Sequence, residues 1–406
     1  MTGFTQSFYW KKIKNTPSEK TSILKNFDKN KYQLFSLNLD NFKILLADVP
    51  SRKNIGSSPM VVINFPDKKG NMEQFQVSET STLAPEIAIK YPNIKTYIGF
   101  SLDNPGGRIR FSISPQGLKT MSTYPNKPAL FTVPLNKGDK SLYISYDRSM
   151  RIDSKKDFEC LTENENVPIK EIISLNRDAN DQILRTLRIA ISTTGEYTNF
   201  WDDGDDTNGD AQEDALAALV STLNRTNEVF EVDMAITFQL VTGTEIIYPT
   251  SSTDPYTGSF NSQLQSTLTS EVGESNYDIG HLFNYGGNNG NAGCIGCVCV
   301  DGQKGSGFSS HSFTDNDGGP NMDDFFDIDY VPHEIGHQMG GNHTFSQSNE
   351  GTGVNYEPGS GTTIMGYAGI TGANDVQDHS DPYFHYGTIN QVLNNLDTRT
   401  CWTSTE

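Results

Sequence analysis

Apolar and polar positions alternate along the first part of the chain. In residues 108–114, RIRFSIS, the apolar side chains Ile109, Phe111 and Ile113 lie on one face and the polar ones on the other. This period-two pattern is typical of a half-buried strand. Three further segments share it: LYISYD, VVINF and YQLFSLNL. One helix is expected at APEIAIKY, where Pro85 fits the first turn, so we predict a β-rich N-terminal region.

The pattern changes after a charged and polar stretch that runs from about residue 153 to residue 185. A strand (TLRIAIST), a long helix (AQEDALAALVSTLNRTNEVFE) and a strand pair (MAITFQLVTGTEIIY) follow, and glycine-rich loops come after them. This order indicates an α/β or α+β fold, and we predict the α+β class. We place the domains at 1–165 and 185–406, joined by a linker at 166–184.

Composition excludes two classes of partner. The 31 basic and 50 acidic residues give a formal charge of −19, which repels nucleic acid and anionic lipid. No apolar run is long enough to cross a bilayer, so we expect no membrane span. The first residues, MTGFTQSFYW, lack the pattern of an export signal, which by itself does not indicate a cytosolic protein.

The stretch HEIGHQMGGNH contains the main candidates for metal binding and catalysis. On a helix, His333 and His337 lie one turn apart on one face, where both imidazoles reach one ion, and Glu334 is placed to hold a water. Gly340 permits a sharp turn with positive φ, so that His343 returns as a third ligand. Three neutral imidazoles leave one position of a zinc ion to water, whose pKa falls to about 7, and Glu334 then accepts its proton.

The same stretch predicts where its helix begins and how specific the site is. Pro332 is compatible with a helix only in the first turn, so we expect the helix to begin near Asp329, a good N-cap residue. A bare HExxH pair is weak evidence, because it also occurs by chance. The added glycine and third histidine favour a catalytic zinc site over a structural metal or a chance cluster.

The motif resembles that of a known protease clan. HEIGHQMGGNH matches the metzincin pattern HExxHxxGxxH in full, and Met365 in the downstream TTIMGYAG is similar to the Met-turn methionine that packs beneath the metal in that clan. The preceding stretch YDIGHLFNYGGNNGNAGCIGCVCVDGQKGSG resembles the helix, edge strand and cysteine of the reprolysins. The likeness covers residues 187–401, and the N-terminal part more loosely resembles the propeptide of bacterial reprolysin-like secreted proteases.

Two positions depart from the reprolysin pattern. Thr344 stands where reprolysins carry an aspartate, as in the pappalysins. Tyr367 stands where they usually carry a proline, which resembles the astacins, serralysins and pappalysins. We therefore place the chain in a bacterial reprolysin-like branch and transfer no subfamily specificity. In metzincins with this pattern the tyrosine donates a hydrogen bond to the oxyanion, which implies a catalytic role for Tyr367.

The resemblance implies a secreted bacterial zinc endopeptidase in zymogen form. It implies a metzincin-type catalytic domain with a twisted mixed sheet, an active-site helix, a Met-turn and a C-terminal helix. The expected partners are protein or peptide substrates, which pair with an edge strand in GNAGCIGCVC, and the chain's own N-terminal prodomain, which acts as an inhibitor. The linker at 166–184 is then the expected place of activation cleavage.

Five cysteines bear on the compartment and on regulation. The four in the C-terminal region permit two disulfides, which is typical of an exported protein. By resemblance to the reprolysins, Cys299 pairs with Cys401 near the C-terminal helix, and Cys294 and Cys297 are then left for each other. The remaining Cys160 favours a cysteine switch, with its thiolate as a fourth zinc ligand, over a buried structural thiol.

Two other functions remain open. One is a binding module, an N-terminal β-sandwich adhesin with a metal-stabilised partner domain, which has no use for Glu334 as a base. The other is a gluzincin-type peptidase, in which a later glutamate such as Glu357 is the third ligand. His343 and Met365 argue against the gluzincin alternative.

Calcium is a second candidate cofactor. Asp278 resembles a calcium ligand of the reprolysins, although no partner glutamate is found at the first strand. The loop WDDGDDTNGD is rich in carboxylates, but its spacing does not fit the EF-hand pattern. We therefore expect a solvated acidic loop there and leave calcium open.

Overall fold

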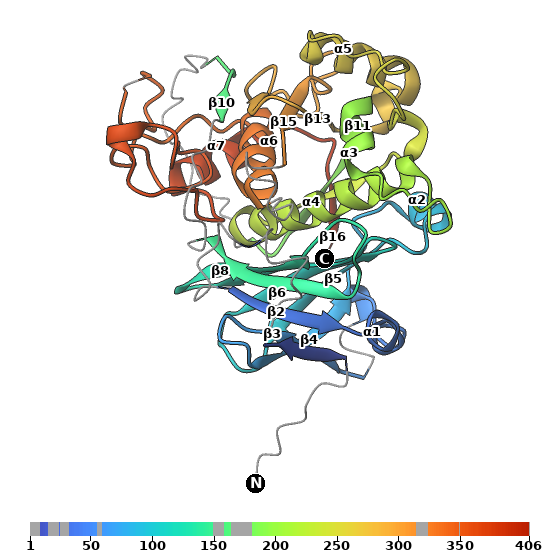
Figure 1. Ribbon diagram of the computed structural model, residues 1–406. Helices are drawn as coiled ribbons and strands as arrows, with labels where there is room; N and C mark the ends of the chain where they lie inside the picture. Colours follow the sequence, from blue (N-terminus) through green and yellow to red (C-terminus); the bar gives the residue numbers. More distant parts are fainter. Residues whose placement is uncertain are drawn as a thin grey trace.

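Two sheets with a long helix between them form the protein (Figure 1). The computed structural model describes residues 9–14, 24, 32–54, 59–148, 158–163, 181–313, 324–348 and 350–405. Within them the predicted α+β class is confirmed, because a nine-stranded sheet forms the N-terminal region and a seven-stranded sheet with helices forms the C-terminal region. No helix in these ranges has the length and apolarity needed to cross a membrane.

The N-terminal sheet is antiparallel, in the order β1-β2-β9-β8-β7-β6-β5-β4-β3. Its strands are β1 (Trp10–Ile13), β2 (Tyr32–Leu37), β3 (Val61–Pro66), β4 (Met72–Glu79), β5 (Lys95–Ser101), β6 (Arg108–Ser114), β7 (Gly117–Tyr124), β8 (Lys127–Pro134) and β9 (Leu142–Asp147). The helices of this region are α1 (Leu39–Leu46), α2 (Pro85–Lys90) and the 3₁₀ turn η2 (Arg52–Asn54). An apolar cluster with Phe42, Phe65 and Phe111 joins α1 to one face of the sheet.

The C-terminal sheet is mixed, in the order β10-β14-β15-β13-β11-β12, and β16 pairs with β11. Its strands are β10 (Glu159–Cys160), β11 (Leu184–Thr193), β12 (Ile236–Leu240), β13 (Ile279–Tyr285), β14 (Asn289–Asn291), β15 (Gly307–His311) and β16 (Thr403–Thr405). β14 is antiparallel to β15, whereas β11, β12, β13 and β15 run parallel. β10 falls within the predicted first domain, yet it pairs with this second sheet.

Five α-helices of the described residues accompany the C-terminal sheet. They are α3 (Gly195–Trp201), α4 (Ala211–Met234), α5 (Phe260–Thr267), α6 (Val331–Met339) and α7 (Tyr386–Leu396). Short 3₁₀ and π-helical turns are η4 (Thr244–Ile246), η5 (Leu268–Val272), η6 (Glu274–Asn276), η7 (Phe326–Tyr330) and η8 (Gly372–Asn374). η4 follows β12 where the sequence predicted the second strand of a pair. A capping box between Asp210 and Glu213 stabilises the N-terminus of α4. It supplies hydrogen-bond acceptors to backbone N–H groups that the first helical turn leaves unpaired.

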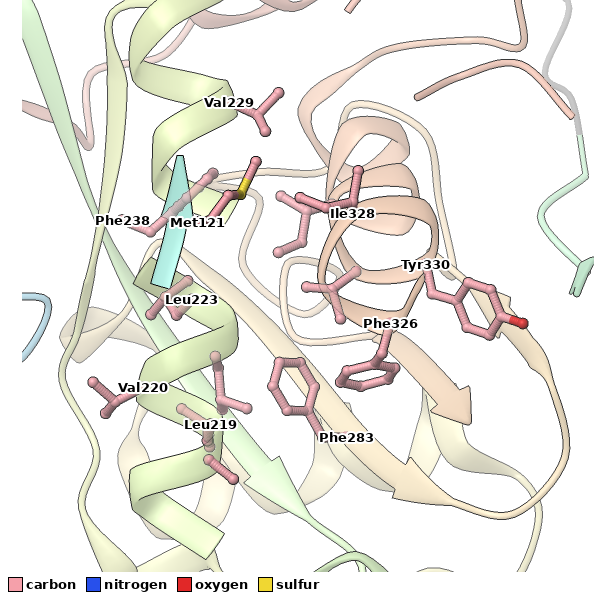
Figure 2. Close-up of a cluster of buried hydrophobic side chains, with 14 of the residues drawn as sticks. Met121, Leu219, Val220, Leu223, Val229, Phe238, Phe283, Phe326, Ile328 and Tyr330 are labelled. Atoms are coloured by element: carbon pink, nitrogen blue, oxygen red, sulfur yellow. The ribbon is translucent and has the colours of Figure 1, made fainter. Parts of the chain in front are cut away.

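One apolar core joins the two regions. Met121 of β7 belongs to the same buried cluster as Leu219 and Leu223 of α4 and Phe326 of η7 (Figure 2). Main-chain hydrogen bonds between Leu240 of β12 and the segment that precedes α2 add a second connection. α4 is therefore buried on both sides, against the N-terminal sheet and against the C-terminal sheet.

Both faces of β6 are buried, although its alternation predicted a half-buried strand. Its apolar residues face the aromatic cluster, whereas Arg110, which is 1% exposed, points toward α4. Arg110 forms ion pairs with Glu228 (Nε to Oε2, 3.0 Å) and Glu231 (Nη2 to Oε2, 2.7 Å). Burial opposes the charge on Glu231, but Arg110 and Arg52 outweigh it and lower the pKa to about 2. The polar positions of β6 form an ionic interface.

A second buried ion cluster lies beside α6. Arg148, just after β9, pairs with Asp324 (Nε to Oδ2, 3.0 Å) and with Asp329. The Asp329 carboxylate also accepts a hydrogen bond from the Ser380 N–H at 2.7 Å. The predicted N-cap role of Asp329 is therefore wrong: η7 precedes the helix, α6 begins at Val331, and Asp329 neutralises an arginine of the N-terminal region.

Both expected disulfides, Cys294–Cys297 and Cys299–Cys401, are confirmed. The longer link joins the loop after β14 to the segment between α7 and β16. It therefore ties the C-terminal end of the chain to the region around the edge strand, where the candidate site lies.

Replacing Arg110 with alanine tests the ionic interface. We expect Arg110→Ala to lower the free energy of unfolding by about 3–5 kcal/mol, because it leaves buried carboxylates without a partner. Urea denaturation of the intact chain measures this change. The matched control is Lys95→Ala, which breaks a partly exposed pair with Glu79 and costs under about 1 kcal/mol. Equal losses in the two variants would contradict the account.

Candidate metal centre

α6 and the turn after it position three histidines. His333 and His337 lie one turn apart on α6, which is buried along its whole length. The helix ends at Gly340, whose φ of 119° lies in a region that side-chain-bearing residues rarely adopt. The chain reverses there and brings His343 back toward the helix.

The imidazole nitrogens of these residues converge on one point. The Nε2 atom of His343 lies 3.3 Å from that of His333 and 3.1 Å from that of His337. The Sγ atom of Cys160 lies 3.6 Å from Nε2 of His337. All four ligand atoms lie within 4.8 Å of one another. The structure thus brings together the four residues that the sequence predicted as metal ligands.

The other ring nitrogens decide which atoms are available to a metal. Nδ1 of His333 lies 2.7 Å from the Ile364 carbonyl oxygen, and Nδ1 of His337 lies 2.7 Å from that of Gly341. A carbonyl oxygen only accepts hydrogen bonds, so both Nδ1 atoms carry the proton and both Nε2 lone pairs point inward. Nδ1 of His343 lies 3.2 Å from the Glu350 carboxylate. This donor set fits zinc, because each ligating imidazole has a partner that fixes its orientation.

The loop that contains Met365 packs against the histidine-bearing helix, as expected of a Met-turn. Met365 is fully buried, and a Cβ atom at position 336 would lie only 2.6 Å from its sulfur, so Gly336 lets the methionine pack against α6. The Thr344 N–H donates to the Met365 carbonyl at 3.1 Å. This contact and the bond from His333 to Ile364 hold the loop against two ligand segments.

Glu357 stabilises this loop by hydrogen bonds. Its carboxylate is not part of the cluster of histidine and cysteine ligand atoms. Its Oε1 accepts hydrogen bonds from the N–H groups of Thr362 (2.8 Å) and Thr363 (3.0 Å), and its Oε2 accepts from the hydroxyls of Thr344 and Thr363. Burial raises its pKa, but these donors outweigh that effect and lower it. Both oxygens are thus engaged, so the contacts do not support the gluzincin alternative. Glu357 instead ties Thr344, where reprolysins have an aspartate, to the Met-turn.

Glu334 lies beside the converging ligands in a dry environment. Its Oε2 accepts a hydrogen bond from the Thr162 hydroxyl at 2.9 Å, and its Oε1 has no hydrogen-bond partner among the described residues. Burial raises its pKa to about 8, and the bond from Thr162 only partly offsets this. A Cβ atom at position 290 would lie 2.5 Å from Oε1, so Gly290 of β14 leaves room for the carboxylate.

Tyr367 follows the Met-turn methionine and packs beside the histidines. Its ring centroid is 4.6 Å from that of His343, 5.9 Å from that of His333 and 4.3 Å from that of Phe345. Burial raises the pKa of Tyr367, and the neighbouring Cys160 and Glu334 add to the effect. The hydroxyl is therefore a neutral phenol that is able to donate a hydrogen bond.

Strand β10 brings Cys160 to the site. It runs parallel to β14, with Cys160 opposite Gly290. The Leu161 N–H donates to the Gly290 carbonyl at 2.8 Å, and the Ala292 N–H donates to the Thr162 hydroxyl at 2.8 Å. Cys160 contacts His337, and Thr162, two residues further along the extended segment just after β10, also points at the centre through its bond to Glu334.

The edge strand is shorter than expected and lies earlier in the chain. β14 spans Asn289–Asn291, whereas the rest of GNAGCIGCVC forms turns. Gly293, Gly296 and Cys299 all have positive φ values, which are incompatible with a strand. The prediction of an edge strand through the cysteines is therefore wrong, because the small Cys294–Cys297 ring requires a turn there.

Three residues at the site were missed or given another role in the sequence analysis. Thr162 had a signal, because it lies two positions after Cys160 and shares its strand face. Glu350, the partner of His343, had none, since its contact depends on the path of the loop after the third histidine. Glu357 was considered only as a ligand. All six predicted site residues lie at or beside the centre, and their chemical roles remain predictions.

The candidate calcium residues have other partners. The Asp278 carboxylate accepts hydrogen bonds from Arg188, through its N–H at 2.7 Å and Nη2 at 2.7 Å. In the acidic loop, Asp210 caps α4, and the Asp214 carboxylate accepts from the Asp203 N–H at 2.8 Å. Calcium therefore remains a prediction without a ligand cluster among the described residues.

A family comparison covers the region that holds the metal centre. The family described as metallo-peptidase family M12B, reprolysin-like, matches residues 183–396. Among solved structures, the crystal structure of metalloproteinase-II from Bacteroides fragilis is similar, with 9% sequence identity and a TM-score of 0.47. The match covers 89% of this chain and 96% of that one. No curated protein matches the chain.

The contact between Glu350 and His343 should strengthen zinc binding, and a substitution of Glu350 tests this. We expect Glu350→Gln to weaken zinc binding by about 10- to 100-fold, because it weakens the acceptor that fixes a ligating ring. Competition with a chromophoric chelator measures the dissociation constant of the intact chain. Glu196→Gln, at an exposed position of α3, is the matched control and should leave the affinity unchanged. An unchanged affinity in the Glu350 variant would show that this contact does not support the site.

Proposed function

The chain belongs to the reprolysin-like metallopeptidase family M12B, and we propose on this basis that it is a zinc endopeptidase held latent by its own N-terminal region. One observation carries the proposal. Three imidazole Nε2 atoms, the thiol of Cys160 and the buried carboxylate of Glu334 meet at one place. The imidazoles suit a metal, the carboxylate suits a base, and the thiol comes from a segment that precedes the matched family region.

In the proposed reaction, His333, His337 and His343 hold zinc through Nε2. Zinc, when bound, supplies a Lewis acid that polarises a carbonyl and lowers the pKa of a water to about 7. Glu334 accepts the proton of the attacking water at Oε1, the oxygen without a hydrogen-bond partner, and delivers it to the leaving nitrogen. Burial supports this role, because it removes competing water from the carboxylate.

Tyr367 is proposed to stabilise the charge that develops on the substrate oxygen. Its phenol stays protonated because burial raises its pKa, so it donates and does not repel negative charge. Its ring packs between His343 and Phe345, which restricts its motion. This packing is compatible with a donor that is aimed at the metal centre.

Peptide substrates are proposed to bind β14 as an added strand. In this structure β10 and the two residues after it use main-chain groups of β14 and its end: the Gly290 carbonyl accepts from the Leu161 N–H, and the Ala292 N–H donates to the Thr162 hydroxyl. A substrate that takes the place of β10 gains the same groups, which is recognition by strand addition. Backbone bonds supply affinity in this mode, and side-chain pockets supply specificity.

Latency is proposed to arise from three simultaneous contacts. Cys160 places a thiol where the fourth ligand of a zinc ion belongs, because thiolates bind zinc strongly. Thr162 donates a hydrogen bond to Glu334, and β10 pairs with β14. The chain thereby blocks the metal, the base and the substrate strand with one short segment. The two disulfides are typical of an oxidising compartment, which supports secretion.

A binding module with a structural metal is the second candidate function. Three histidines and one cysteine make a closed four-ligand set, which is typical of structural zinc sites. Glu334 argues against it, because a structural site gains nothing from a buried carboxylate next to its ligands. The two functions differ in whether removing Cys160 exposes an active enzyme.

The role of Glu334 is tested in an intact chain that carries Cys160→Ala. We expect the further change Glu334→Gln to lower kcat by about 100- to 10,000-fold, because it removes the base. Zinc content, measured by atomic emission, should stay unchanged, because no ligand is lost. A parallel loss of zinc and activity would show that Glu334 binds the metal.

The latency contacts make a separate prediction. Cys160→Ala should give an uncut chain with slow but measurable hydrolysis of a fluorogenic peptide, because it removes the thiol and leaves β10 tethered on β14, whereas the wild-type chain should show no hydrolysis. Thr162→Val should also raise activity, by a smaller factor, because it frees Glu334 but leaves the thiol in place. Thr162→Ser keeps the hydroxyl and is the matched control. If Cys160→Ala is as inactive as the wild type, the switch is refuted.

A further inference from the structure

The contact between the N-terminal sheet and the C-terminal region has the character of a protein interior. Met121 and Phe131 from the sheet share one buried cluster with Leu223 and Phe230 of α4. Main-chain bonds connect Leu240 to the N-terminal region, with the Ala84 N–H donating to its carbonyl at 2.8 Å. Permanent interfaces look like a core cut in half, whereas interfaces that separate readily are more polar.

In the ion pairs across this contact, the cation comes from the N-terminal region and the carboxylate from the C-terminal region. The N-terminal region supplies the arginines Arg108, Arg110 and Arg148. The C-terminal region supplies the carboxylates, among them Glu228 and Asp324, which are 2% and 1% exposed on their side chains. Breaking a buried pair is strongly destabilising. Separation of the regions would break these pairs and expose the shared apolar cluster to water.

The inhibitory segment, residues 158–163, is held far less firmly. Its contacts include the β10–β14 pairing, the bonds of Thr162, the bond from Asn291 to the Leu161 carbonyl, and the packing of Phe158 against Tyr330 and His333. Apart from the proposed contact between Cys160 and zinc, a strand this short binds weakly on its own, because few contacts offset the cost of ordering it. Its place in the site depends on the high effective concentration that a covalent tether provides.

The segment is tethered on both sides. Upstream, the chain leads back to Arg148 and β9, which belong to the firmly docked N-terminal sheet. Downstream, it leads to β11 of the C-terminal sheet. A single cut on either side thus leaves the segment attached to one of two bodies that stay together.

From this arrangement we propose that the N-terminal sheet is a permanent subunit of the mature protein and that β10 leaves only after cuts on both sides of it. The inference rests on the proposed latency of the site. It departs from the expectation that cleavage at 166–184 is the activating step. The product is a two-chain protein from which a short peptide containing Cys160 has been excised.

The test uses the full-length zinc-loaded chain with recognition sequences for a sequence-specific protease. One variant carries the sequence within residues 149–157, a second within 164–180, and a third carries both. After digestion, gel filtration shows whether the two halves elute together, and mass spectrometry shows whether the Cys160 peptide is still present. Alkylation of Cys160 by iodoacetamide reports whether β10 has left the site in the singly cut chains.

We expect the two halves to elute together in every digest, and at raised salt as well, because buried pairs are weakly screened. Cys160 should resist alkylation in both singly cut chains, and the peptide should be lost only from the doubly cut chain. Peptidase activity should appear in that chain alone. In the doubly cut chain, Arg110→Ala should increase the fraction of separated halves, whereas Lys95→Ala should not.

Each result that differs from these expectations overturns a different part of the proposal. Separation of the halves in native buffer overturns the permanent subunit, and alkylation or activity after a single cut overturns the requirement for two cuts. If the doubly cut chain loses the peptide and stays assembled but has no peptidase activity, the inference stands and the proposed function fails.

Discussion

Three imidazole rings, each of which donates a hydrogen bond through Nδ1 to a fixed acceptor, are the constraint on which the C-terminal region depends. The acceptors come from three separate segments: Ile364 in the Met-turn, Gly341 after the helix, and Glu350 in the loop beyond. Because these bonds commit Nδ1, the Nε2 lone pairs face one another, which is unfavourable without a cation. The left-handed turn at Gly340 and the buried Met365 serve the same geometry.

The proposed inhibition uses the groups that catalysis needs. Cys160 lies with the metal ligands, Thr162 bonds to Glu334, and β10 pairs with the strand to which a substrate would add. A weak segment suffices for this because it is tethered to well-docked bodies. The strength of the assembly resides instead in α4, whose apolar side chains and carboxylates are both covered by the N-terminal sheet.

Local patterns predicted the site well, because helical spacing and the conformational freedom of glycine act over a few residues. They explain why HExxHxxGxxH specifies converging histidines. Contacts between residues far apart in the sequence could not be predicted from these local patterns. The alternation in β6 gives no sign that Arg110 meets carboxylates far along the chain, and Asp329 looks like a helix cap although it pairs with Arg148. The extent of the edge strand was misjudged because the disulfide and the positive-φ turn at Gly293 end it early.

X-ray absorption at the zinc edge tests the central claim most directly, because it reports which atoms surround the metal in the intact chain. The account predicts three nitrogen neighbours at about 2.0–2.1 Å and one sulfur at about 2.3 Å. The sulfur contribution should vanish in Cys160→Ala while the nitrogen contribution remains. A wild-type spectrum with only nitrogen and oxygen neighbours would contradict the account, because zinc would then be bound without the thiol of β10.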